Sequence, residues 1–450
     1  MSFWTAERVA QALRVPSPAH LTFSGISTDT RHLTPGTLFV ALKGDRFDAH
    51  GFLAPALAQG AAAAVVRRGT APVDGLPVFE VADTLVALGD LARARRRALL
   101  PLRPTVAPVV AVTGSSGKTS AKEMIRAALA ARWRVHATTG NLNNLVGVPL
   151  TILGAPDDTE ALVVEAGASV PGEIARLRDI IEPTVGVVTN VGYAHLEGFG
   201  SLEGVLGEKV RLLERVPVAV VGTDPPALAE AARRLARTVV AGSDETAAVR
   251  PDAAELDDAG RARITWHGVS VTLPVAGFHQ VENAMIALAV ARETGVEAAR
   301  AVAALARVAI PGGRGGLLEA GALTIVDDSY NANPSSLRAA VALARWLARR
   351  RGRPLVLVVG TMLELGAESA RLHAAAAAEI AAAPPDLVAA VGAFVPAFEA
   401  HRGVLGGRLL TAPDAETLGP KLKSAVPGNA IVLLKASRGV ALERVLRYLT

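Results

Sequence analysis

The chain of 450 residues contains no cysteine. This absence excludes disulfides, thiolate nucleophiles and zinc–thiolate sites, and it is typical of proteins from a reducing compartment. Aromatic residues make up 4% of the chain, too few for the aromatic-rich basic surfaces that bind nucleic acid. A GxGxxG motif is also missing, so the sequence gives no support to dinucleotide binding. We therefore expect no nucleic-acid partner.

The sequence also lacks a stretch that would span a membrane. The segment 373–398 is rich in small apolar residues, but Glu379 and the residues 384–386 interrupt it with charges and prolines. The N-terminus carries Glu7 and Arg8 where a signal peptide needs an apolar core. We therefore expect a soluble cytoplasmic protein.

Charge and length place further limits on the chain. Its length suits two to four domains, and a formal net charge of +5 suits an anionic small-molecule substrate. Arginine clusters at 93–97 and 349–353 each end an Ala/Leu-rich helical pattern. We interpret both clusters as solvated helix C-termini, where cations complement the helix dipole.

The segment 108–132 is organised as a strand, a glycine turn and a helix. An apolar run at 108–112 predicts a buried strand, and two glycines lie in the turn 113–117. Apolar residues spaced three and four apart then predict a helix. In this layout backbone N–H groups converge on an anion at the helix N-terminus. We interpret the segment as a phosphate-binding loop, with an ordinary strand–helix turn as the alternative.

The residues after the turn fit the same interpretation. Lys118 supplies a charge for the outer phosphates of a nucleotide, and the Thr119 hydroxyl can bind magnesium. The loop is shorter than the usual GxxxxGK[ST] motif. It reads Gly114-x-x-Gly117-Lys118-Thr119, and the first glycine of the usual motif would fall at Val112.

Apolar strands alternate with helical patterns along the rest of the chain, which predicts an α/β protein with parallel sheets covered on both faces. The predicted strands are 162–164, 185–188, 218–221, 323–326, 355–359, 387–391 and 431–434. Breakers near 101–108 and 310–315 predict three domains. We expect a small α/β domain at 1–105, a central P-loop parallel-sheet domain at 106–315 and a C-terminal Rossmann-like α/β domain at 316–450.

Polar side chains gather where the central strands end. Glu165 ends one strand, residues 189–190 end the next, and His195 follows in the loop. Ligands of such sheets bind outside the carboxyl ends of the strands, so Thr119, Glu165 and His195 are expected to converge. Lys209 lies one helical segment later. Thr119 and Glu165 carry oxygen ligands suited to Mg²⁺, whereas His195 and a protonated Lys209 would be unusual ligands, and solvated side chains are their alternative.

Other polar segments lie at turns or strand ends, where binding groups are common. The amide-rich loop 138–144 can bind a sugar or peptide, or simply make a turn. Asp29-Thr30-Arg31 and Asp48-Ala49-His50 lie in the N-terminal region, where an Asx turn explains the first as well as binding does. The strand at 323–326 runs into an unusually polar end, DDSYNANP at 327–334.

Together these motifs resemble the Mur ligase family, the ATP-dependent cytoplasmic enzymes that build the peptide stem of peptidoglycan. The loop 114–120 is similar to the short phosphate loop of the family. Residues 189–197 resemble its TN…AH segment, and 277–283 resemble its GxHNxxN segment. DDSYNANP, supported by 140–144 and 360–366, resembles the branch that adds D-alanyl-D-alanine to UDP-N-acetylmuramoyl-tripeptide.

The resemblance implies a reaction. ATP phosphorylates the C-terminal carboxylate of the UDP-N-acetylmuramoyl-tripeptide, and the amine of D-alanyl-D-alanine attacks the acyl phosphate to give the pentapeptide. The third residue of the tripeptide stays open between diaminopimelate, lysine and another diamino acid. The alternatives are a family member that adds a single amino acid, a P-loop phosphotransferase or NTPase, and a non-catalytic binder of UDP-peptides. A monomer is expected.

The resemblance also implies roles for individual residues. Lys118 would contact the outer phosphates, and Thr119 with Glu165 would hold one Mg²⁺. His195 and a Lys209 carbamylated by CO₂ would hold a second Mg²⁺, because the carbamate turns the amine into an anionic oxygen ligand. Lys118, Glu165, His195 and Lys209 would thus be the catalytic set.

The nucleotide and the UDP moiety would bind at further positions that match family motifs. The implied ATP-binding residues are Gly114, Ser115, Ser116, Gly117, Lys118, Thr119, Ser120, Asn283, Arg314 and Asp328. The implied UDP-binding residues are Asp29, Thr30, Arg31, Asp48 and His50. Two departures from the family pattern are visible: Gln280 replaces the usual Asn after His279, and Ala49 replaces the usual Gly before His50.

Overall fold

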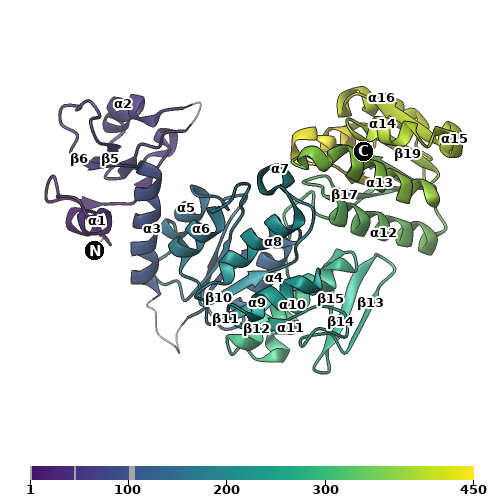
Figure 1. Cartoon of the computed structure of the whole chain (residues 1–450), viewed down its shortest axis with the longest axis horizontal. Helices are drawn as coiled ribbons and strands as arrows, with labels where there is room; N and C mark the ends of the chain where they lie inside the picture. The colour runs from purple at the N-terminus through teal and green to yellow at the C-terminus, as the bar shows by residue number, and fades with distance from the viewer. Residues whose placement is uncertain (1–2, 45–46, 101–106) are drawn as a thin grey trace. The chain divides into compact units, whose positions relative to one another are not determined.

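The computed structural model describes residues 3–44, 47–100 and 107–450, so the expected domain boundary at 105–106 lies outside the described residues. The chain divides into two compact units. Unit 1 comprises Met1–Ala111, Trp133–Gly167 and Glu173–Pro183, and unit 2 comprises Val112–Arg132, Ala168–Gly172 and Thr184–Thr450. Helices alternate with mainly parallel sheets in the described parts of the chain, which confirms the predicted α/β class (Figure 1).

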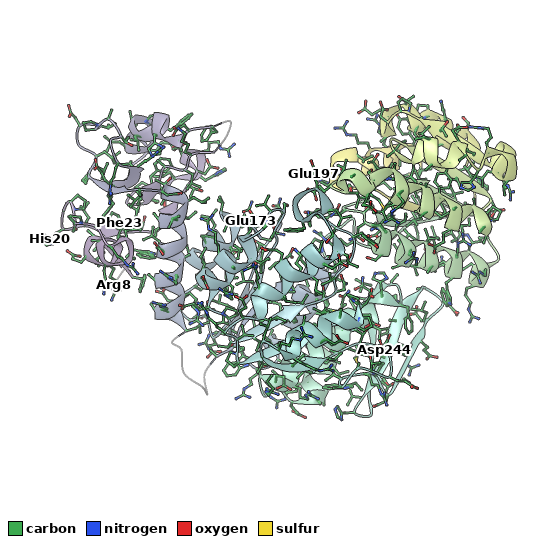
Figure 2. All side chains as sticks on the ribbon, viewed as in Figure 1. Arg8, His20, Phe23, Glu173, Glu197 and Asp244 are labelled. Carbon is green, nitrogen blue, oxygen red and sulfur yellow. The ribbon has the colours of Figure 1, made fainter. Side chains whose placement is uncertain are left out.

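A four-stranded parallel sheet forms the N-terminal core of unit 1. Its order is β3 (Ile26–Ser27), β4 (Leu38–Val40), β5 (Ala63–Arg67) and β6 (Val78–Val81). Phe23, labelled in Figure 2, is fully buried, and its ring lies 6.3 Å from that of Phe79. Phe23 ends β2 (Thr22–Phe23), which pairs with β1 (Trp4–Thr5) beside the helix α1 (Ala6–Leu13). Burial of two aromatic rings contributes about 1.5–3 kcal/mol each to this core.

The helix α3 (Thr84–Leu99) corrects one prediction. Arg96 is fully buried, and its guanidinium donates to the carbonyl oxygens of Ile181 at 2.9 Å and Leu100 at 2.5 Å. Arg95 is buried too and donates to the carbonyl of Ala155 at 3.0 Å. The interpretation of this cluster as a solvated helix end is therefore wrong at both positions. Guanidinium donors here satisfy carbonyls at segment ends that would otherwise be buried without partners.

The central sheet has the order β12-β11-β10-β7-β9-β8. Its strands are β7 (Val109–Thr113), β8 (Val135–Ala137), β9 (Ala161–Glu165), β10 (Val185–Val188), β11 (Val218–Val221) and β12 (Arg237–Val240). The pairs β8–β9, β10–β11 and β11–β12 are parallel, as predicted. Every residue of β7, β9 and β10 is buried, which explains their continuous apolar runs.

Unit 2 also contains an antiparallel sheet that was not predicted. Its strands are β13 (Ala253–Leu256), β14 (Arg261–Trp266) and β15 (Val269–Ala276). Residues of β14 alternate between buried and exposed positions, so its sequence alternates between apolar and polar. A search for continuous apolar runs misses such a strand.

The C-terminal sheet has the order β16-β17-β21-β18-β19-β20. Its strands are β16 (Gly316–Ala320), β17 (Leu323–Asp328), β18 (Leu355–Val359), β19 (Leu387–Val391), β20 (Leu409–Ala412) and β21 (Ile431–Lys435). The strands β17, β18, β19 and β21 confirm the four predictions. The antiparallel edge strand β16 and the edge strand β20 were missed. In the sheet register Asp328 faces Lys435, so both side chains lie where β17 and β21 end.

The remaining helices follow or precede these strands. They are α2 (Leu53–Ala58), α4 (Lys118–Ala130), α5 (Gly147–Leu153), α6 (Glu173–Ile181), α7 (Leu196–Phe199), α8 (Leu202–Val210), α9 (Pro226–Arg233), α10 (His279–Glu293), α11 (Ala298–Leu305), α12 (Pro334–Arg351), α13 (Ser369–Ala382), α14 (Phe394–Glu399), α15 (Arg402–Leu405) and α16 (Ala415–Ala425). Within the described residues, no helix has the length and apolar character needed to cross a membrane.

Candidate active site

The phosphate loop joins the end of β7 to the first turn of α4, as predicted. Gly114 has φ +147° and Gly117 has φ +76°. Residues with a Cβ rarely adopt such positive φ values, because the conformation is strained for them. A Cβ on Gly114 would overlap the Thr189 hydroxyl, and one on Gly117 would lie 2.5 Å from Asn283 Oδ1. Both glycines are therefore required by backbone conformation and by space.

Side chains after β10 hold this loop in place. The Thr189 hydroxyl donates to the Ser116 carbonyl at 2.6 Å, and Asn190 Oδ1 accepts from the Ser116 N–H at 2.9 Å. The Ser115 N–H donates to the Asn190 carbonyl at 3.0 Å, and the Ser115 hydroxyl accepts from the Gly192 N–H at 2.9 Å. Contacts within the chain thus shape the loop. Sequence reasoning placed 189–190 at a strand end but gave them no role in supporting the loop.

The residues after the loop begin the helix α4. Lys118 Nζ donates to the Gly114 carbonyl at 2.8 Å, which folds the lysine back over the loop. Thr119 and Ser120 are buried in the first helical turn. An ammonium group and a helix N-terminus at one loop both favour an anion, and the binding of phosphate here stays a prediction.

Asn283 lies in the first turns of α10 against the phosphate loop. It is buried, and its Nδ2 donates to Gln280 Oε1 at 3.0 Å. Gln280 Nε2 lies 3.0 Å from His279 Nε2, so the three side chains form a chain of contacts. Gln280, the departure from the family pattern, therefore holds the amide of Asn283. The contact between Asn283 and an adenine stays a prediction.

Glu165 ends β9 and is buried in unit 1. Its Oε1 accepts from Asn143 Nδ2 at 2.8 Å, and its N–H donates to the Thr138 hydroxyl at 3.0 Å. The amide-rich loop 138–144 thus supports the carboxylate, a role that the sequence analysis did not assign to it. Thr119 belongs to unit 2, and its predicted convergence with Glu165 stays a prediction.

His195 and Lys209 contact the same aromatic ring. The Phe199 ring centroid lies 6.3 Å from that of His195 and 5.6 Å from Lys209 Nζ. Lys209 is fully buried in α8, and the His195 side chain is one-fifth exposed at the start of α7. The structure therefore places these two predicted site residues around one side chain within unit 2.

Glu364 is a further group at His195 that sequence reasoning did not assign. Its Oε2 lies 2.6 Å from His195 Nδ1. The His195 ring holds the pKa of this carboxyl below its ordinary value, and the charge of Lys118 contributes in the same direction. The only signal in the sequence was its place in the segment 360–366 at the end of β18.

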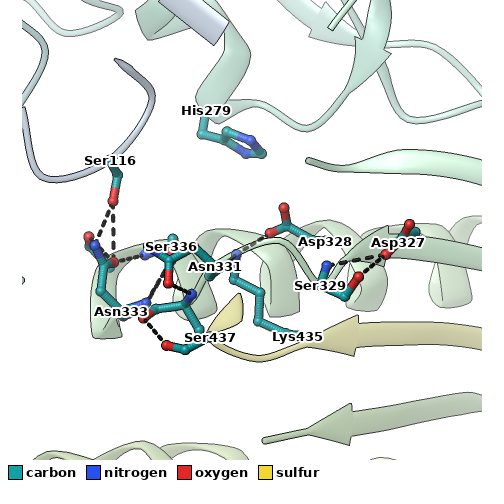
Figure 3. A network of polar contacts seen from close by, with 12 residues as sticks. Ser116, His279, Asp327, Asp328, Ser329, Asn331, Asn333, Ser336, Lys435 and Ser437 are labelled. Atoms are coloured by element: carbon teal, nitrogen blue, oxygen red, sulfur yellow. Dashed lines mark hydrogen bonds and ion pairs between the residues drawn. The ribbon is translucent and has the colours of Figure 1, made fainter. Parts of the chain in front are cut away.

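The segment DDSYNANP connects the C-terminal sheet to the phosphate loop. Asn333 Nδ2 donates to the Ser116 hydroxyl at 2.9 Å, and Asn333 Oδ1 lies 3.2 Å from the same hydroxyl (Figure 3). Asn333 also caps α12, because its Oδ1 accepts from the Ser336 N–H at 2.9 Å. One side chain therefore starts a helix and contacts the phosphate loop.

Asp328 pairs with a buried lysine. Lys435 Nζ lies 2.5 Å from Asp328 Oδ2 and donates to the Asn331 carbonyl at 2.8 Å. Figure 3 shows the His279 ring beside this pair. Burial lowers the pKa of His279, while the charges of Asp328 and Lys435 act on it in opposite directions. Lys435 fixes the Asp328 carboxylate, whose contact with a nucleotide stays a prediction.

Arg314 lies over an aromatic ring of the same segment. Its guanidinium carbon is 3.6 Å from the Tyr330 ring centroid, and that of Arg438 is 5.7 Å away. Cation–π contact holds a guanidinium without using all of its N–H donors. Arg314 thus retains donors suited to a phosphate, and its contact with the nucleotide stays a prediction.

In the N-terminal region the predicted UDP-binding residues make contacts within their own turns. Asp29 accepts from the Arg31 N–H at 3.0 Å and binds the exposed Arg31 side chain, which holds the pKa of Asp29 well below its usual range. Thr30 follows Asp29, which caps this turn. The Asx-turn geometry considered from the sequence is present here. Binding of UDP by these residues stays a prediction.

The second turn fixes a histidine tautomer. Asp48 Oδ1 lies 2.6 Å from His50 Nδ1, and His50 Nε2 accepts from the Arg67 N–H at 3.0 Å. A ring nitrogen that accepts cannot carry the proton, so the proton lies on Nδ1. Hydrogen bonds from His50 lower the pKa of Asp48 to about 2.

The ligand atoms that the predicted metal-binding residues offer can be compared with those that Mg²⁺ prefers. No group of three or more His, Asp and Glu that could hold a metal lies within the ranges 3–44, 47–100 and 107–450. Thr119 and Glu165 supply the hard oxygens that Mg²⁺ prefers. Lys209 fits only after carbamylation, since an ammonium cannot coordinate. By donor chemistry Thr119 and Glu165 are suited to Mg²⁺, and the binding of an ion by these residues stays a prediction.

Comparison with known proteins decides the family. The chain matches the family model of the Mur ligase middle domain over residues 112–291 and that of the Mur ligase, glutamate ligase domain over 313–438. The UDP-N-acetylmuramoyl-tripeptide--D-alanyl-D-alanine ligase of Escherichia coli (strain K12) is 39% identical over 96% of this chain and 94% of its own. The chain belongs to the Mur ligase family. The resemblance predicted from its motifs is thereby confirmed.

Other relatives of this Mur ligase agree. The enzyme of the same name from Bacillus subtilis (strain 168) is 34% identical over 98% of this chain and 96% of its own. A crystal structure of MurF from Acinetobacter baumannii has a TM-score of 0.88 at 32% identity, with 99% and 98% of the two chains covered. MurF ligase from Thermotoga maritima in complex with ADP has a TM-score of 0.82 at 31% identity, with 94% and 96% covered.

Proposed function

We infer that this Mur ligase is an ATP-dependent enzyme that joins D-alanyl-D-alanine to UDP-N-acetylmuramoyl-tripeptide, with release of ADP and phosphate. The observation that carries this inference is near full-length similarity to ligases of that name, together with an intact phosphate loop that ends in Lys118 and Thr119. The product is UDP-N-acetylmuramoyl-pentapeptide, a precursor of peptidoglycan.

The reaction proceeds through an acyl phosphate. A terminal carboxylate oxygen of the tripeptide attacks the γ-phosphorus of ATP, and the bond to ADP breaks. The amine of the dipeptide then attacks the acyl carbon, loses a proton and expels phosphate. Because a carboxylate is a poor electrophile and an acyl phosphate a good one, the protein has to position the groups and neutralise their charge. Lys118 and the N-terminus of α4 would serve the phosphates in both steps.

Two Mg²⁺ ions complete the site in this proposal. When bound, they would supply positive charge that neutralises the phosphates and would orient the phosphate oxygens. Thr119 and Glu165 would hold the first, and His195 with Lys209 as a carbamate formed from CO₂ would hold the second. The shared contact of His195 and Lys209 with Phe199 supports their assignment to one ion.

The substrates distribute over three proposed domains. Residues 1–105 would bind the UDP end of the substrate through Asp29, Thr30, Arg31, Asp48 and His50, and 106–315 would bind ATP. Residues 316–450 would supply Asp328 and the groups near the acceptor. Arg314 and Asn283 would complete the nucleotide site. We place the enzyme in the cytoplasm, where ATP is available. We expect it to act as a monomer and to have no nucleic-acid partner.

An acceptor competition tests this function. The protein, ATP, Mg²⁺ and UDP-N-acetylmuramoyl-tripeptide are mixed with equal concentrations of D-alanyl-D-alanine and single amino acids, and the products are identified by mass spectrometry. A pentapeptide as the main product is expected. A product extended by one residue would instead indicate a Mur ligase with a single amino acid as acceptor. Nucleotide hydrolysis without any peptide product would indicate a simple NTPase.

A further inference from the structure

The segment Gly360–Gly366, GTMLELG, carries the clearest contact that the reaction above does not explain. It follows β18 and presents Glu364 to His195, with 2.6 Å between Oε2 and Nδ1. We propose that Glu364 is the positioning residue of His195: its carboxylate holds the proton on Nδ1 and so leaves Nε2 available to bind a metal ion. The proposal deepens the proposed function and rests on it for the identity of that ion, Mg²⁺.

Backbone conformation supports a specific contact at this point. His195 has φ +55° and Glu364 has φ +63°, the left-handed region that is uncommon for residues other than glycine. Such a conformation costs about 1–3 kcal/mol and persists where surrounding contacts impose it, most often at functional sites. His195 and Glu364 both adopt it at the point where their side chains meet.

The loop that carries Glu364 is fixed from the inside. The Met362 N–H donates to His373 Nε2 at 2.9 Å, and the Leu363 N–H donates to the Ser437 hydroxyl at 2.9 Å. The Thr361 hydroxyl accepts from the Ala393 N–H at 2.9 Å. Three consecutive residues before Glu364 are thus anchored to three different elements. The position of the carboxylate is therefore set by α13, by the start of α14 and by the loop after β21.

The loop also contacts the helix that His195 begins. The N–H of Glu197, labelled in Figure 2, donates to the Glu364 carbonyl at 3.2 Å. A Cβ on Gly366, which has φ +55°, would lie 3.2 Å from Glu197 Cα. Backbone and side chain of the loop therefore contact α7 together. This arrangement orients the His195 ring with respect to the C-terminal part of unit 2.

The contact with Glu364 determines which ring nitrogen of His195 carries the proton. A neutral imidazole has one N–H and one accepting nitrogen, and a carboxylate at one nitrogen decides which is which. Metal-binding histidines commonly donate their second N–H to a carboxylate, and loss of that partner costs about 10–100-fold in metal affinity or activity. Asp48 Oδ1 and His50 Nδ1 lie at the same separation of 2.6 Å in this chain, and there the two groups form a hydrogen bond.

The experiment compares Glu364→Gln with wild type by NMR of ¹⁵N-labelled histidine, with His195 assigned from a His195→Gln spectrum. We expect the Nδ1–H tautomer at His195 in wild type and a mixture with Nε2–H in Glu364→Gln. We also expect kcat to fall about tenfold or more, with little change in KM for the UDP-tripeptide. The control is Glu368→Gln, because Glu368 pairs with Arg371 on the surface nearby.

An unchanged His195 tautomer and an unchanged kcat in Glu364→Gln would overturn the proposal, as would equal losses in Glu368→Gln. Glu364→Asp keeps the negative charge, so it should restore part of the wild-type tautomer and part of the wild-type kcat if the contact is direct.

The tautomer is measured by NMR without any catalytic turnover. A protein that shows the tautomer change but makes no pentapeptide would therefore refute the proposed function and leave the role of Glu364 standing.

Discussion

Replacement of Asn333 separates two roles that the structure gives to one side chain. Asn333 Oδ1 caps α12 by accepting from the Ser336 N–H, and its amide contacts the Ser116 hydroxyl of the phosphate loop. Alanine removes both contacts. Serine at this position can still cap the helix but is too short to reach Ser116. The pair Asn333→Ala and Asn333→Ser therefore measures cap and loop contact independently.

The magnitudes follow from the contacts. Loss of an N-cap costs about 0.5–2 kcal/mol, and loss of a hydrogen bond between neutral groups costs about 0.5–1.5 kcal/mol. Hydrogen exchange measures each locally, because a loss of about 1 kcal/mol raises the exchange of the affected amides about fivefold. In Asn333→Ala we expect faster exchange at the N-terminus of α12 and in the phosphate loop. In Asn333→Ser we expect it in the loop alone, with a raised KM for ATP.

Two results would refute this reasoning. Unchanged exchange at the start of α12 in Asn333→Ala would mean that Asn333 does not stabilise the helix. Wild-type loop exchange and a wild-type KM for ATP in Asn333→Ser would mean that its contact with Ser116 is not needed to shape the loop.

Four further predictions concern other contacts. Gly114→Ala should abolish ATP binding in calorimetry while the circular dichroism spectrum stays that of wild type, since φ +147° and the Thr189 hydroxyl leave no room for a Cβ. Thr189→Val keeps the shape but loses the bond to the loop, and it should raise KM for ATP about two- to tenfold; a wild-type KM would contradict the supporting role. Lys209→Ala should abolish ligation but not UDP-peptide binding, with partial rescue by short carboxylates; full activity without rescue would refute the carbamate. Asp48 has a pKa of about 2 against an ordinary 3.8, so its contribution to stability is present above pH 3.8 and is lost as the pH falls toward 2. The difference in thermal unfolding midpoint between wild type and Asp48→Asn should therefore narrow over that range, and a constant difference would count against the pairing with His50.

The fold was predictable where strands are buried on both faces. β7, β9, β10 and β18 are buried along their whole length, so each appears as a continuous apolar run. β14 alternates, and β16 and β20 are edge strands with partly exposed residues, so none of the three gives that signal. Strands could therefore be predicted only where the local sequence forms a continuous apolar run.

The layout of the phosphate loop was predictable because its residues are contiguous in sequence. Gly114, Gly117 and Lys118 form one motif between a strand and a helix. The contact of Ser116 with Asn333 spans 217 residues, and no periodicity predicts which strand ends meet. The burial of Arg96 was missed for the same reason, since its acceptor at Ile181 is 85 residues away.

Phosphate release tests the central claim most directly. The enzyme is supplied with ATP, Mg²⁺ and UDP-N-acetylmuramoyl-tripeptide, with or without D-alanyl-D-alanine, and phosphate is measured together with the product mass. We predict release that requires both substrates and equals the pentapeptide formed. Release of phosphate that is indifferent to the dipeptide, or that exceeds the pentapeptide severalfold, would contradict a D-alanyl-D-alanine ligase.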